Sequence, residues 1–232
     1  MKTFHNHIPQ GYSDSSLSES FNKWLPELFL RKSVFDKPDL DPSNKEMMSS
    51  YLERHLYLVS MNLRGGIGIV SDKKAPIRSG FLFDSIYKGW YLSVCKRLLG
   101  KRYNKKFNRQ PFTVAFLDVE GTRYFSAPST FQMPHIHSLM LVHPSSASRF
   151  ELLSKSEQFT KINDTRISDI DIRQFRDDGR FIGPMMTYAA KFTRQTLTNG
   201  RPDKTWSAYP DVQSLHYPFY RVLDGEQNVQ TA

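Results

Sequence analysis

Four stretches of the chain have the short apolar or alternating patterns of β-strands. The runs 56–63 (LYLVSMNL), 112–121 (FTVAFLDVEG) and 134–143 (PHIHSLMLVH) are rich in apolar residues and are bounded by turn or loop sequences. In 166–175 (RISDIDIRQF) isoleucines alternate loosely with acidic residues, which is typical of an edge strand. We expect the second and third runs to pair with each other across the loop that connects them.

Helical patterns separate these predicted strands. Apolar residues recur every three or four positions in 79–100, and this spacing predicts an amphipathic helix. A polar helix is predicted over 145–159, and a further helix over 183–197, which Pro184 opens without loss of a needed donor. The order strand, helix, strand, strand, helix, strand, helix predicts an α+β fold in which helices pack on an antiparallel sheet of about five strands.

The regions outside this alternation are polar or irregular. Residues 1–48 are rich in Ser, Pro, Asp and Asn, so we expect a partly helical N-terminal extension. Residues 49–222 form the predicted main domain, which ends in an aromatic, irregular segment, and residues 223–232 form a flexible tail. No run of about 18 apolar residues and no secretory signal is present, so we expect a cytoplasmic protein with no membrane partner. The single Cys95 excludes a multi-cysteine zinc site.

Positive charge dominates the chain and is unevenly spread. The sequence has 32 Lys and Arg against 23 Asp and Glu, a net charge of +9 that favours a polyanionic partner. The segment 96–109 contains no acid, and we call its cations the basic strip: Lys96, Arg97, Lys101, Arg102, Lys105, Lys106 and Arg109. Two interpretations stay open, a strip that contacts DNA phosphates and a solvated helix end whose cations suit the helix dipole.

The third predicted strand carries two histidines in an otherwise apolar run. Side chains alternate along a strand, so His135 and His137 point to one face and Ile136 points to the other. Two convergent imidazoles are a recurring way to hold a divalent metal, although exposed strand histidines are the competing interpretation. A third ligand is needed, and Asp118 and Glu120 share a face at the end of the preceding strand. We favour Glu120, with Asp118 as the alternative.

The predicted helix after Pro184 carries a second candidate element. Tyr188 and Lys191 lie three residues apart and share a helix face. A tyrosine is a poor nucleophile at its ordinary pKa of about 10, so a nearby cation or a polarised phosphate is needed for attack. A tyrosine and a lysine at this spacing are also common on helix surfaces.

Three motifs follow one another along the chain in a specific order. They are an apolar strand (LYLVSMNL), a His-hydrophobe-His strand preceded by proline (PHIHSLML) and a later helix with Tyr-x-x-Lys (YAAK). This combination resembles the HUH endonuclease superfamily over roughly residues 50–200. Within the superfamily it is most similar to the single-tyrosine replication initiators of rolling-circle plasmids, phages and small single-stranded DNA viruses.

The resemblance implies a nuclease-like α+β sandwich and a two-part site. His135 and His137, with an acidic or polar third ligand, would hold Mg²⁺ or Mn²⁺ against a scissile phosphate of single-stranded DNA. Tyr188 would attack to form a 5′-phosphotyrosine and free a 3′-hydroxyl primer, and Lys191 would hold phosphate or favour tyrosinate. The partners implied are single-stranded DNA or an origin hairpin, a host helicase and a DNA polymerase.

Other functions stay open at the level of sequence. A single-tyrosine transposase or relaxase of the same superfamily is one alternative. A catalytically silent DNA-binding module on the same fold, in which the basic strip does the main work, is another. A metal-dependent hydrolase of small phosphoesters is a third, which the basic charge disfavours. The chain has no G-x-x-x-x-G-K-[ST] motif, which excludes a fused ATPase or helicase.

Overall fold

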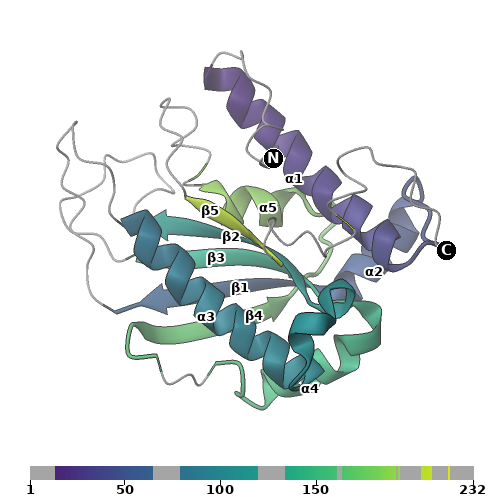
Figure 1. Ribbon diagram of the computed structural model, residues 1–232. Helices are drawn as coiled ribbons and strands as arrows, with labels where there is room; N and C mark the ends of the chain where they lie inside the picture. Colours follow the sequence, from purple (N-terminus) through teal and green to yellow (C-terminus); the bar gives the residue numbers. More distant parts are fainter. Residues whose placement is uncertain are drawn as a thin grey trace.

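An antiparallel sheet of five strands lies at the centre of the structure, a computed structural model (Figure 1). The structure describes residues 14–64, 79–119, 134–160, 164–191, 193, 205–210 and 219. The strands are β1 (Leu56–Leu63), β2 (Phe112–Val119), β3 (Pro134–Leu141), β4 (Ile167–Gln174) and β5 (Trp206–Tyr209). Their order across the sheet is β4-β1-β3-β2-β5. The predicted α+β fold with an antiparallel sheet of about five strands is confirmed.

The edges of the sheet show one confirmed expectation and one that was wrong. β4 is an edge strand, as its alternating isoleucines and acids predict, and β2 pairs with β3. The opposite edge is β5, which lies in the segment that we expected to be irregular. With four residues, β5 is too short to produce a readable alternation, and its pairing with β2 decides its conformation.

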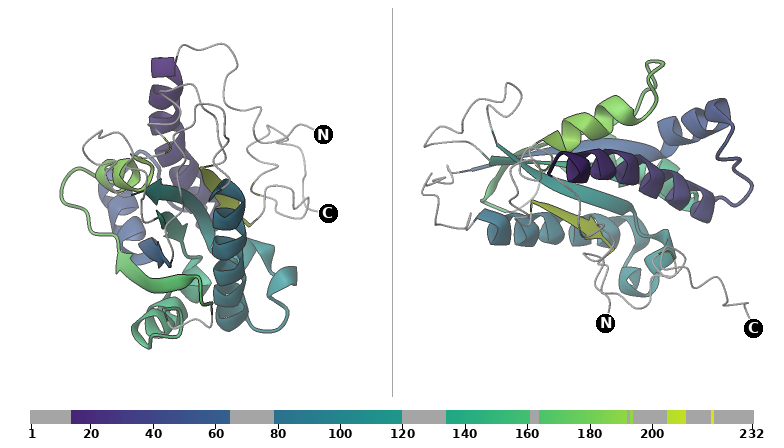
Figure 2. Two further views of the ribbon diagram at one scale, coloured as in Figure 1. Left: turned by 90° about the vertical axis from the view of Figure 1, so that its left-hand side faces the viewer. Right: turned by 90° about the horizontal axis from the view of Figure 1, so that it is seen from above.

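Helices cover both faces of the sheet (Figure 2). One face carries α3 (Ser79–Leu99) and α4 (Ala147–Lys155), and the other carries α1 (Asp14–Asp36), α2 (Lys45–His55) and α5 (Gly183–Ala189). Short 3₁₀ turns occupy Tyr103–Lys105, Phe107–Arg109 and Pro144–Ser146. Among the described helices, none combines the length and the apolar character that crossing a membrane requires.

The helix α1 falls within the predicted 1–48 extension and packs on the sheet. Leu25, Leu28 and Phe29 are buried in the same hydrophobic cluster as Phe112, and the ring centroids of Phe29 and Phe112 are 5.3 Å apart. One turn further on, α1 buries an ion pair between Lys32 and Asp36. An isolated buried charge is costly, and the opposite charge four residues away compensates it.

Side-chain alternation gives the sheet two chemically different faces. Met61, Leu117 and Ile136 point toward α3 and belong to one apolar cluster with it. The neighbouring positions Ser60 and His137 face the side that carries α5. A register shift where β1 meets β4, at Asn62 and Leu63, leaves one extra residue in β4. Ile167 and Ile170 can therefore both point into the core, although they lie three residues apart.

Ile136 lies between the two histidines on β3 and anchors this strand to the core, because its side chain is fully buried on the face that carries α3. We expect Ile136→Ala to lower the free energy of unfolding by about 3 kcal/mol, because it removes buried methyl groups and leaves a cavity. Urea unfolding measures the change. Leu152→Ala is the control, since Leu152 is 68% exposed and should change stability by less than about 0.5 kcal/mol. Equal effects of the two substitutions would contradict this packing.

Candidate metal centre

Three side chains from two neighbouring strands converge on the face that carries α5. Asp118 on β2 lies directly opposite His135 on β3 in the antiparallel register, and His137 lies two residues along on the same face. The ligand atoms of Asp118, His135 and His137 all lie within 4.8 Å of one another. This group is able to hold a metal ion.

The carboxylate of Asp118 is the centre of the cluster. Its Oδ2 lies 2.9 Å from Nε2 of His135, 3.2 Å from Nε2 of His137 and 2.7 Å from Nζ of Lys191. Asp118 is fully buried, and burial by itself raises a carboxyl pKa. The contacts with His135, His137 and Lys191 outweigh that effect and hold the pKa of Asp118 well below its usual range. Asp118 is therefore an anionic ligand at neutral pH.

The ring of His137 is fixed by a neighbour on β1. Its Nδ1 lies 3.0 Å from Oγ of Ser60, the residue directly opposite His137 in the β1–β3 pairing. Burial, helped by the nearby His135 and Lys191, lowers the pKa of His137, so the neutral imidazole that metals bind prevails. Ser60 was not among the predicted site residues. A serine at an alternate position of an apolar strand is the signal that could have found it.

The donor set fits a divalent cation. Nε2 of His137 is buried and makes no hydrogen bond within the part of the chain that the structure describes, although Oδ2 of Asp118 is 3.2 Å away. When Nδ1 of His137 donates to Ser60, Nε2 carries a lone pair that faces the carboxylate of Asp118. A cation placed between this nitrogen and the carboxylate oxygen stabilises both atoms. Two imidazoles and one carboxylate leave coordination positions open for a substrate oxygen.

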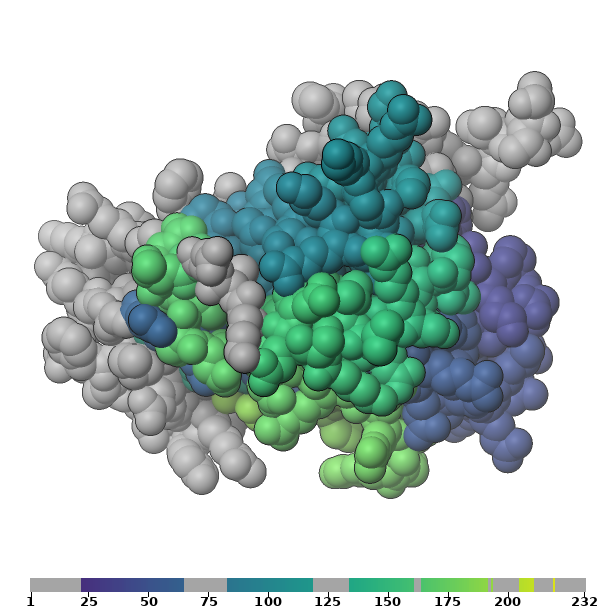
Figure 3. Space-filling view, turned by 90° about the horizontal axis from the view of Figure 1, so that it is seen from below, coloured from purple at the N-terminus to yellow at the C-terminus, as the bar shows by residue number. Residues whose placement is uncertain are grey.

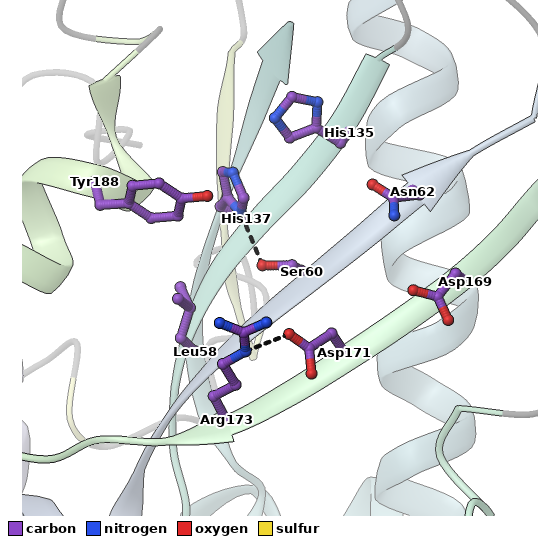
Figure 4. Close-up of a pocket in the computed structure, with 9 residues that line it drawn as sticks. All are labelled: Leu58, Ser60, Asn62, His135, His137, Asp169, Asp171, Arg173 and Tyr188. Atoms are coloured by element: carbon purple, nitrogen blue, oxygen red, sulfur yellow. Dashed lines mark hydrogen bonds and ion pairs between the residues drawn. The ribbon is translucent and has the colours of Figure 1, made fainter. Parts of the chain in front are cut away.

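Tyr188 lies beside this cluster. Its ring centroid is 4.7 Å from that of His137, and its hydroxyl points toward His137 (Figure 4). Tyr188 is 45% exposed, which is unusual for so large an aromatic residue. Nζ of Lys191 lies 4.9 Å from the centroid of the Tyr188 ring while it contacts Asp118. Lys191 thus contacts both Tyr188 and Asp118, which are far apart in the sequence.

These groups open into a groove of about 740 Å³ on the β3, β1 and β4 side of the sheet (Figure 4). The residues that line it are Leu58, Ser60, Asn62, His135, His137, Asp169, Asp171, Arg173 and Tyr188. Most of them are polar, and several are charged, so the groove suits a polar ligand rather than an apolar one.

Of the two candidate carboxylates, the structure describes Asp118 alone. It places Asp118 with both histidines, whereas Glu120, which we favoured from the sequence, lies outside the described residues. Asp118 reaches the cluster because of the strand register, since it faces His135 across the β2–β3 pair. The predicted group of His135, His137, Tyr188 and Lys191 does come together around it.

The basic strip lies elsewhere on the molecule. It begins in the last turn of α3 and ends just before β2, whereas Asp118 lies near the other end of β2. Asp118 lies six positions along the strand from Phe112, which corresponds to about 20 Å. Several cations of the strip bond to local groups: Arg109 to Ser145 at 3.1 Å, and Lys106 to the carbonyl oxygen of Leu99 at 2.8 Å. In Figure 3 this teal region lies beside the green α4 region.

Removal of a ligand should abolish metal binding. We expect the protein to bind one Mn²⁺, and the loss of the electron paramagnetic resonance signal of free Mn²⁺ measures this binding. The substitution Asp118→Asn should abolish it. Ser60→Ala should weaken Mn²⁺ binding about tenfold, because it frees the ring of His137. His143→Ala is the control, since this half-buried histidine caps the turn after β3, away from the cluster. Unchanged uptake by Asp118→Asn would rule out this centre.

Comparisons with known proteins add no family to this geometry. No protein family model matches the chain, and no significant similarity to a curated protein or to a solved structure was found. The function of the groove therefore has to be inferred from its own residues.

Proposed function

We propose that this protein is a metal-dependent enzyme that nicks and rejoins single-stranded DNA, as a replication initiator of a plasmid, phage or other mobile element. One observation carries the proposal: Tyr188 lies 4.7 Å, ring to ring, from His137 within the buried Asp118, His135 and His137 group. The motif order that resembles the HUH endonuclease superfamily supports the same function. The proposed nucleophile and both histidines line one open groove, and Lys191 contacts Asp118 and the Tyr188 ring.

The metal proposed is Mn²⁺ or Mg²⁺. Mg²⁺ prefers oxygen ligands, whereas Mn²⁺ binds more tightly to sites that contain nitrogen, so two imidazoles favour Mn²⁺ of the pair. When bound, the ion supplies Lewis acidity to a phosphoryl oxygen and neutralises the charge that develops there. Asp118, His135 and His137 hold it, and Ser60 orients His137.

The proposed reaction is a transesterification at one phosphodiester. Oη of Tyr188 forms a bond to phosphorus and loses its proton to solvent, which reaches this 45% exposed residue. The bond from phosphorus to the 3′-oxygen breaks, and that oxygen takes up a proton. The products are a 5′-phosphotyrosine on the protein and a free 3′-hydroxyl end, which a DNA polymerase can extend.

Lys191 is suited to assist the tyrosine. Its ammonium contacts Asp118 and lies near the Tyr188 ring, where a positive charge attracts the phosphate that the tyrosine attacks. Because the phosphotyrosine bond keeps the energy of the phosphodiester, attack by a 3′-hydroxyl can rejoin the strand without ATP. Unwinding of the DNA is a separate step, and we propose a host helicase for it.

The nucleophile can be tested directly. Incubation of the protein with single-stranded DNA and Mn²⁺ should give a covalent protein–DNA adduct that survives denaturing electrophoresis. Tyr188→Phe should reduce the adduct by at least about 10³-fold, because no other group replaces the missing hydroxyl. Tyr57→Phe is the matched control and should leave the adduct unchanged, since Tyr57 is buried against Phe150 on the opposite face of the sheet. An adduct that survives Tyr188→Phe would show that the nucleophile lies elsewhere.

A second experiment separates the enzyme from a catalytically silent DNA-binding module. We expect replacement of Lys101, Arg102 and Lys105 by Ala to weaken DNA binding, because exposed cations release counterions when they bind phosphates. The slope of log K against log salt should fall by about 0.7 for each phosphate that the variant no longer neutralises. Adduct formation at saturating DNA should stay unchanged.

The control for this experiment removes the same charge elsewhere. Replacement of Lys23, Lys37 and Lys45 by Ala affects the region of α1 and α2 and should leave the salt slope as it is. If the strip variant binds DNA as tightly as the unmodified protein, the strip is a solvated helix end. The catalytically silent DNA-binding module is the better description if two results coincide: the strip variant no longer binds DNA, and the unmodified protein forms no adduct.

A further inference from the structure

Polar side chains form two rows that run across the sheet from the metal ligands to its edge. In the strand register, His135 lies opposite Asn62, and Asn62 lies opposite Asp169. The neighbouring row runs from His137 through Ser60 to Asp171. Because adjacent strands are about 4.8 Å apart, each aspartate lies about 10 Å from its histidine at the Cα atoms. All these side chains line the groove (Figure 4).

The far end of these rows is negatively charged. Asp171 pairs with Arg173, whose Nε lies 2.5 Å from its Oδ2. Asp169 is exposed and has no ion pair or hydrogen bond through its side chain in the described part of the chain. Among the side chains of β4 that line the groove, two carboxylates and one guanidinium leave a net negative charge, which repels a phosphate. A DNA strand held at the cluster by its phosphate must therefore present something else to β4.

We propose that the β4 side of the groove is a base-reading subsite, which selects nucleobases that carry an amino group on the Watson–Crick edge. This inference rests on the proposed function, since it places a nucleotide phosphate at the metal centre. The distance from the histidines to Asp169 and Asp171 is comparable to the length of one nucleotide from its phosphate to the far edge of its base. The subsite thus reads the nucleotide at the scissile phosphate.

The chemistry of the groove decides which bases suit it. A carboxylate only accepts hydrogen bonds, so it pairs with the amino group of cytosine, adenine or guanine. Thymine and uracil present only one donor on this edge, N3–H, and two carbonyl oxygens flank it, which a carboxylate repels. Asn62, between His135 and Asp169, offers both a donor and an acceptor and is suited to the remaining edge atoms. Asp169 and Asp171 therefore discriminate mainly against thymine and uracil.

The test compares two probes that differ only at the Watson–Crick edge. Oligodeoxycytidine and oligodeoxyuridine of equal length are titrated with the full chain carrying Tyr188→Phe in the presence of Mn²⁺, which fills the metal centre without adduct formation, and binding is followed by fluorescence anisotropy. We expect at least about fivefold tighter binding of oligodeoxycytidine. The double variant Asp169→Asn, Asp171→Asn should bring the ratio close to one, because an amide also donates. Asp39→Asn, which removes one exposed carboxylate after α1, should keep the ratio.

The outcomes separate this inference from the proposed function. A ratio near one with Asp169 and Asp171 intact overturns the subsite, even if the unmodified protein forms the tyrosine adduct. So does a double variant that binds both probes more tightly by the same factor, since the carboxylates would then merely repel phosphates. A ratio that depends on Asp169 and Asp171 supports the subsite, and failure of the adduct in Mn²⁺ would then count against nicking alone. A protein that binds neither probe overturns both.

Discussion

The candidate site depends on one buried carboxylate, that of Asp118. A fully buried negative charge is stable only when several partners compensate it, and here His135, His137 and Lys191 lie within 3.2 Å of the same oxygen. These partners come from β3 and from the segment after α5, so the carboxylate ties the sheet to the helix that carries Tyr188. The position of the tyrosine next to the histidines follows from this attachment.

The sheet separates stability from chemistry by side-chain alternation. Ile136 and Leu117 are buried against α3, whereas their neighbours in sequence, His137 and Asp118, belong to the polar cluster on the other face. The apolar face therefore holds β2 and β3 in register while the opposite face keeps its polar groups. Ser60 fixes the ring orientation of His137 without any change of the sheet, because the strand register already places Ser60 directly opposite His137.

The charges of the protein are divided between two regions. The basic strip lies at the end of α3, near the start of β2, and the acidic positions Asp169 and Asp171 lie on the edge strand beside the groove. In the function that we propose, the strip would hold phosphates of the DNA and the acidic positions would contact its bases. A net charge of +9 by itself would not suggest an acidic subsite beside the metal centre.

The sequence by itself determined the strands β1 to β4, the antiparallel α+β class and the shared face of His135 and His137, because period-two alternation is a local property of the chain. It also singled out Tyr188 and Lys191, although α5 ends at Ala189 and Lys191 follows it rather than sharing a helix face with Tyr188. Only the tertiary structure decided that Asp118 faces His135, that Ser60 holds His137 and that Lys191 reaches Asp118. Those contacts depend on strand register and helix docking, which are set by packing between residues distant in sequence and leave no mark in a local pattern.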